Sequence, residues 1–194
     1  IVENELEIFH SNSLIISVVK TLHLYAPVSE EHGWRGASTS PAYLTSPVVV
    51  EVPDPGEIEE TRKIYFRFSK EDSTVIIDQS KYSLNRWVNS PWGTLRFLTN
   101  PHYYPGTKKT HDSTRYFFQL VSLDHATNGI LGNLSVSSAS KQSSIINLSI
   151  KDPIPLRAET IISEIVIAYN QASAERKSSV ALRTLKFIED RLKN

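Results

Sequence analysis

The sequence predicts an α+β fold: a small mixed or antiparallel sheet packed by N-terminal helices, with one long C-terminal helix projecting from this base. Three observations predict it. Apolar residues recur with helical spacing in residues 3–24. Short β-branched and aromatic runs, separated by turn residues, occupy residues 46–151. The segment from Leu156 onward contains neither glycine nor proline.

Residues 3–24 are expected to form two helical pieces. Leu14, Val18 and Leu22 are spaced by four residues, so they share one helical face. Ser11 or Ser13 is a candidate N-cap for the second piece, because a serine hydroxyl can accept a hydrogen bond from a free amide of the first turn. The helices are therefore expected to pack on the sheet through one apolar stripe.

The middle of the chain is expected to contain the strands and their loops. Residues 27–46 and 99–113 are rich in proline, glycine and small polar residues, which is typical of loops. β-branched or alternating runs predict strands over residues 47–52, 64–68, 74–78, 95–98, 115–121, 134–136 and 145–150.

The last segment is expected to be one helix of ~39 residues, about 58 Å long at the usual rise per residue. Asp152 can cap it, and Pro153 or Pro155 suits its first turn. The core of a domain of this size cannot cover such a helix, so its far end is expected to project or to pack on other chains.

The candidate self-association face is Ala181, Leu185, Ile188 and Leu192, whose steps of four, three and four residues are typical of a packed helical seam. Packing against residues 3–24 of the same chain is the alternative.

Composition limits the function. The 194 residues suit one domain, divided into N-terminal helices (1–25), a strand-rich base (46–151) and the long helix (153–194). The 21 basic residues balance the 21 acidic ones, which argues against a nucleic-acid partner. The absence of cysteine excludes disulfides, thiolate zinc sites and a cysteine nucleophile. Methionine is also absent, so we expect the sequence to be a piece of a longer protein.

The sequence predicts no catalytic, cofactor or metal site. It contains no phosphate-binding or dinucleotide-binding glycine motif and no serine elbow. None of the six histidines has the spacing of a zinc site. Two histidines adjoin an aspartate and are expected to be solvated loop residues: His111-Asp112 and Asp124-His125.

Two alternative functions remain open. One is a carbohydrate-active hydrolase that uses His111, Asp112 or the carboxylates of Glu57, Glu59 and Glu60. It requires a concave pocket that brings these groups together. The other is a generic extracellular binding or adhesin-like module.

Several segments, taken in order, resemble a known bacterial family. They are ENELEIFHS (residues 3–11), VVKTLHLY (18–25), YLTSPV (43–48), SPWGTL (90–95), DPIPLRAE (152–159) and FIEDRL (187–192). Together they resemble the periplasmic part of chain-length determinant proteins, the polysaccharide co-polymerases, including those fused to a cytoplasmic tyrosine autokinase. The pattern is most similar to versions from exopolysaccharide and capsule systems. Asn12 stands where the family commonly has arginine, so an ion pair there is not carried over.

The resemblance implies the function. Family members are anchored in the inner membrane by two transmembrane helices, which this sequence does not contain, and several copies form a ring on the periplasmic face. The ring regulates the chain length and export of exopolysaccharide, capsule or lipopolysaccharide. The implied partners are other copies, the polymerase and export machinery, and the nascent polysaccharide; no cofactor is implied. The segment is expected to be a scaffold and not itself an enzyme.

Overall fold

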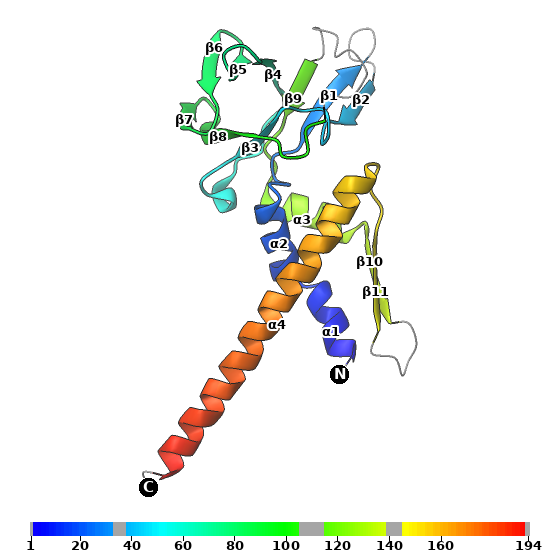
Figure 1. The fold of residues 1–194 in the computed structure, drawn as a ribbon, viewed down its shortest axis with the longest axis vertical. Helices are drawn as coiled ribbons and strands as arrows, with labels where there is room; N and C mark the ends of the chain where they lie inside the picture. The colour runs from blue at the N-terminus through cyan, green and yellow to red at the C-terminus, as the bar shows by residue number, and fades with distance from the viewer. Residues whose placement is uncertain (1, 33–37, 105–114, 139–144, 193–194) are drawn as a thin grey trace.

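The structure, a computed structural model, describes residues 2–32, 38–104, 115–138 and 145–192. Figure 1 shows two parts. The β module contains strands β1 to β9, and the helical module contains α1 to α4 with the hairpin β10–β11. The long helix α4 passes beside the other helices and then continues alone, away from the β module (Figure 1).

The first two helices match the two expected pieces. Helix α1 spans Val2–Phe9 and α2 spans Asn12–Thr21. Ser11 is the N-cap of α2, and its hydroxyl accepts a hydrogen bond from the amide of Leu14 at 3.4 Å. Helix α2 ends where His23 adopts a left-handed conformation, with φ of 53°. The amide of Leu24 then donates to the carbonyl of Val19 at 2.9 Å, which closes the helix end.

Two antiparallel sheets make up the β module. One has six strands in the order β2-β1-β9-β4-β5-β6, and the other has three in the order β3-β8-β7. The strands are β1 (Val28–His32), β2 (Ser38–Pro41), β3 (Val48–Glu51), β4 (Ile64–Ser69), β5 (Thr74–Ile77), β6 (Ser80–Ser83), β7 (Trp87–Ser90), β8 (Gly93–Thr99) and β9 (Arg115–Phe118), with the short 3₁₀ helix η2 (Pro55–Glu57) after β3. Each pairing of neighbouring strands is antiparallel.

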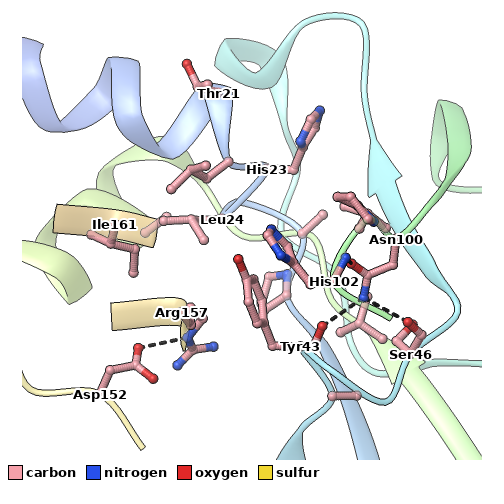
Figure 2. A pocket seen from close by; sticks show the side chains of 18 of the residues that line it. Thr21, His23, Leu24, Tyr43, Ser46, Asn100, His102, Asp152, Arg157 and Ile161 are labelled. Carbon is pink, nitrogen blue, oxygen red and sulfur yellow. Dashed lines mark hydrogen bonds and ion pairs between the residues drawn. The ribbon is translucent and has the colours of Figure 1, made fainter. Parts of the chain in front are cut away.

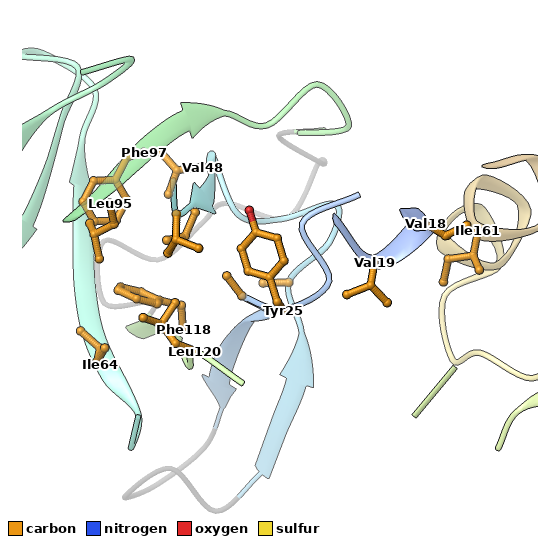
Figure 3. Close-up of a cluster of buried hydrophobic side chains, with 14 of the residues drawn as sticks. Val18, Val19, Tyr25, Val48, Ile64, Leu95, Phe97, Phe118, Leu120 and Ile161 are labelled. Atoms are coloured by element: carbon orange, nitrogen blue, oxygen red, sulfur yellow. The ribbon is translucent and has the colours of Figure 1, made fainter. Parts of the chain in front are cut away.

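The two sheets pack face to face through aromatic side chains. Phe97 of β8 and Phe118 of β9 are fully buried and meet edge to face, with ring centroids 6.0 Å apart. Figure 3 shows that the core continues through Tyr25 and Val19 to the helical module. Burial raises the pKa of the Tyr25 hydroxyl to about 12. The two modules therefore share one continuous apolar core.

The helical module is built on the first half of α4, which spans Pro155–Leu192. It also contains α3 (Leu123–Leu131), β10 (Leu134–Ser138) and β11 (Ile146–Ile150), and the last two form an antiparallel hairpin. Ile161 and Ile165 of α4 are buried in the core that includes α2. The ring of Tyr169 stacks on Phe9 of α1 with centroids 4.4 Å apart, and its hydroxyl donates a hydrogen bond to Glu5.

The predicted α+β class is confirmed, with antiparallel sheets, N-terminal helices and one long C-terminal helix. Several elements differ from the expectation in detail. Strands β1 and β2 lie in the expected loop of residues 27–46. Their polar sequences gain strand structure by pairing, β1 with β9 and β2 with β1. Helix α3 and strands β6 and β7 were also not expected. Within the described ranges, no helix is both long and apolar enough to cross a membrane.

Candidate functional site

The outer half of α4 carries the candidate self-association face. Leu185 is 57% exposed and Ile188 is 48% exposed. Ala181 is exposed as well. Leu192 is the last residue of the helix and continues the same spacing. The structure therefore presents three of these side chains to solvent, and none of the three is covered by residues 5–21.

This face lies on the side of α4 away from its own domain. Leu185 follows Ile165 by twenty residues, which is about 200° around a helix at ~100° per residue. Ile165 is buried, so the direction of Leu185 is outward. Ile167 and Ala174 are exposed, and the same geometry places them in line with Leu185. We call Ile167, Ala174, Ala181, Leu185 and Ile188 the outer stripe.

A cavity of about 770 Å³ lies at the junction of the two modules (Figure 2), and we call it the junction pocket. Its walls come from the end of α2, the loops after β2 and β8, helix α3, and the segment that leads into α4. Leu24, Ile130 and Ile161 contribute apolar surface, while Tyr43, His102 and Arg157 contribute polar groups. This size is typical of pockets for small molecules.

Asn100 fixes one polar wall of the junction pocket. This buried residue donates from Nδ2 to the carbonyls of Tyr43 and Ser46, each at 2.8 Å, and its Oδ1 accepts from the amide of His102 at 2.9 Å. The rings of Tyr43 and His102 stack with centroids 4.9 Å apart. The Tyr43 hydroxyl donates to Thr160 of α4 at 3.3 Å. The wall is thus held rigidly and tied to the long helix.

An ion pair forms the opposite polar corner of the junction pocket. Arg157 donates from Nε to Oδ2 of Asp152 at 2.8 Å, and Oδ1 of Asp152 accepts from the amide of Ile154 at 2.8 Å. Asp152 lies three residues before Pro155, so its carboxylate closes the turn that leads into α4 and orients the guanidinium. The cap expected at Asp152 is therefore a turn contact outside the helix, because its partner is the amide of Ile154. Among the described residues, the Nη groups of Arg157 have no hydrogen-bond partner.

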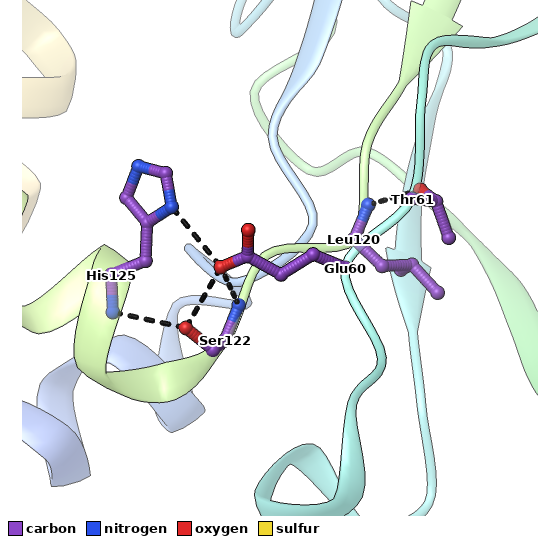
Figure 4. Close-up of polar contacts among 5 residues, drawn as sticks. All are labelled: Glu60, Thr61, Leu120, Ser122 and His125. Carbon is purple, nitrogen blue, oxygen red and sulfur yellow. Dashed lines mark hydrogen bonds and ion pairs between the residues drawn. The ribbon is translucent and has the colours of Figure 1, made fainter.

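Glu60 belongs to a helix cap and not to the junction pocket (Figure 4). Its Oε1 accepts from the amide of Ser122 at 3.1 Å and from the Ser122 hydroxyl at 2.9 Å, and it lies 3.1 Å from Nδ1 of His125. Ser122 is the N-cap of α3. The amide of Ser122, with smaller contributions from its hydroxyl and from His125, holds the pKa of Glu60 below its ordinary value. These contacts stabilise the start of α3.

Among the described residues, the other carboxylates of the hydrolase hypothesis form no hydrogen bond or ion pair with this cap. Glu57 and Glu59 are exposed. His111 and Asp112 lie outside the described residues, so the hydrolase hypothesis stays a prediction. In the described part of the chain, no three histidine or carboxylate side chains form a group that could hold a metal ion. No motif marks the junction pocket in the sequence, because six separate segments assemble it.

The comparisons with known proteins identify a distant relative. No protein-family model matches the chain. The tyrosine-protein kinase ptk of Acinetobacter johnsonii is 26% identical over 208 aligned positions. The alignment covers 97% of this chain but 28% of that protein. The chain therefore has a distant homologue of known name and spans less than a third of its length.

Proposed function

We propose that this chain is the periplasmic scaffold of an inner-membrane protein that regulates the chain length and export of exopolysaccharide, capsule or lipopolysaccharide. It acts by self-association, and its partners are other copies, the polymerase and export machinery, and the nascent polysaccharide. It performs no catalysis itself, and any kinase activity of the whole protein lies outside this segment.

One observation carries the proposal. The long helix exposes an apolar stripe on the side that its own domain does not use, and this stripe continues to Ile188, well beyond Ala168, the last residue of α4 in the buried core. Exposure of the apolar side chains of Leu185 and Ile188 to water is unfavourable. A second copy of α4 that packs along the stripe would bury these side chains, and the four–three spacing suits such a helical seam.

The comparison supports the same reading. A tyrosine-protein kinase matches nearly the whole chain with a small part of its own. The sequence resembles co-polymerases that include members fused to a tyrosine kinase, so the name of the relative agrees with that resemblance. In such a protein the membrane anchor holds copies close together, and this raises their effective concentration. A weak contact along one helix is then sufficient for a closed ring.

The proposal is tested in the bacterium that makes the polymer. Leu185→Asp with Ile188→Asp places two charges in the outer stripe without touching the core. Ser179→Asp is the matched control, because Ser179 is exposed and follows Ile165 by two heptads, on the other side of α4. We expect the double variant to lose the normal length distribution on a polysaccharide gel, and Ser179→Asp to keep it. A normal distribution in the double variant, at normal protein level, would contradict the proposal.

A further inference from the structure

The proposed scaffold function does not use the junction pocket, although the polar groups of this pocket are fixed by hydrogen bonds and ring stacking. One wall is apolar, with Leu24, Ile130 and Ile161. The facing wall carries the stacked rings of Tyr43 and His102, held from behind by the buried Asn100. A pocket that combines an apolar wall with a few fixed polar groups is typical of small-molecule sites.

Arg157 is the strongest recognition group in this pocket. Its side chain is mostly buried, and Asp152 holds it through Nε alone. Figure 2 shows the guanidinium on the wall between Asp152 and Tyr43. The two Nη groups therefore remain as donors in a fixed plane. A guanidinium in this state can bind the two oxygens of a carboxylate or phosphate side by side.

The local charge favours an anion. Lys151 and Arg157 line the pocket against one carboxylate, that of Asp152. Both oxygens of Asp152 are already engaged, one by Arg157 and one by the amide of Ile154. The pocket also lies at the start of the 38-residue helix α4, whose positive dipole end adds to the attraction.

We infer that the junction pocket binds a small organic anion. A carboxylate or phosphate monoester lies on Arg157 with Lys151 beside it, and the ring or hydrocarbon body of the ligand contacts Leu24, Ile130 and Ile161. The flat Tyr43–His102 stack bounds the body on the other side. Because the walls come from both modules, such a ligand binds the folded chain and not the unfolded one, and it raises the thermal stability.

The test uses the 194-residue chain and four defined probes. Glucuronate and glucose 6-phosphate carry an anionic group on a ring, glucose is the neutral match, and inorganic phosphate is the anion without a body. Binding is followed by amide NMR shifts and by the melting temperature. We expect both anionic sugars to bind at least tenfold more tightly than glucose, because a charge-assisted bidentate contact contributes at least that factor. They should also bind more tightly than inorganic phosphate.

Two variants locate the site. Arg157→Gln removes the anion contact, and Arg67→Gln on the outside of β4 is its control. Gly129→Trp fills the pocket from α3, where an added Cβ meets no atom within 4 Å, and it leaves the ion pair intact. Asn128→Trp, one residue earlier and not in the lining, is its control. We expect Arg157→Gln and Gly129→Trp each to weaken glucuronate binding tenfold or more.

Three results would overturn the inference. They are equal binding of glucose and glucuronate, inorganic phosphate binding as tightly as glucose 6-phosphate, and unchanged glucuronate binding in a folded Gly129→Trp variant. None of them bears on association through the outer stripe, and loss of that association leaves the pocket unchanged. The two proposals therefore fail separately.

Discussion

Ile165 and Leu185 lie on opposite sides of one helix. Ile165 is 0% exposed and belongs to the core, whereas Leu185 is 57% exposed. The two residues have similar side chains and the same backbone conformation, so the difference comes from what surrounds α4. Its first half has α1, α2 and β11 beside it, while its second half projects alone (Figure 1). The helix therefore has an inner side for folding and an outer side that is free for contact.

The first prediction concerns stability. Ile165→Ala removes a buried side chain, so we expect the free energy of unfolding to fall by about 2–5 kcal/mol. Leu185→Ala removes an exposed one, and we expect a change within about 0.5 kcal/mol. Urea unfolding of the isolated chain measures both. Similar losses in the two variants would show that Leu185 packs inside its own molecule.

The second prediction concerns the docking of α1. Tyr169 stacks on Phe9 and donates to Glu5, and this hydrogen bond is the main reason that the pKa of Tyr169 is raised. Tyr169→Phe keeps the stack and should cost about 1 kcal/mol. Tyr169→Ala loses both contacts and should cost about 3 kcal/mol. Hydrogen exchange should accelerate in α1 more than in α3, and uniform acceleration would contradict a local role.

The third prediction uses the left-handed residue at the end of α2. Glycine is the usual residue at this position, because a side chain strains a positive φ. The ring of His23 contacts the ring of Tyr25 edge to face, and its Nε2 lies 3.8 Å from Oε1 of Glu51. These two contacts offset part of the backbone strain. We expect His23→Gly to change the melting temperature little or to raise it, and the β-branched His23→Val to lower it. A lower value for the glycine variant than for valine would contradict this account.

The fourth prediction is a pH dependence at the start of α3. The pKa of Glu60 is depressed in the folded chain, mainly by the amide of Ser122. A depressed carboxyl pKa contributes stability that is complete above the ordinary value of about 4.5 and is lost as the pH falls through the lower folded value. Glu60→Gln cannot titrate. The stability difference between the two proteins should therefore shrink on acidification, in urea unfolding at neutral pH and at about pH 3. The same stability difference at both pH values would contradict a stabilising role for ionised Glu60 at the start of α3.

Much of the fold was predictable because it depends on local signals. The long helix and the N-cap at Ser11 follow from residue type and spacing. Strand β1 was not predictable, because its sequence VSEEH lacks an apolar alternation and β9 supplies the partner. Helix α3 carries Thr127 and Gly129, which weaken a helical pattern, although Ser122 and Asp124 at its start are a cap signal.

The two candidate sites also differ in how far the sequence predicts them. The outer stripe was predictable in part, since heptad spacing is a property of consecutive residues. Its direction was not, because only the packed structure shows which side of α4 the domain uses. The junction pocket was not predictable at all. Arg157, Tyr43 and Asn100 are far apart in the sequence and meet only when the two modules fold together.

The central claim is that copies of α4 meet through the outer stripe. The chain contains no cysteine, so single cysteines at Ala181, Leu185, Ile188 and Leu192 can be introduced without competing thiols in this segment. They are tested in the protein as the bacterium makes it, with Ser179→Cys as the control on the other side of the helix. The account predicts disulfide-linked products between subunits at these four positions and little product at Ser179. No intersubunit product at any of the four positions would contradict it.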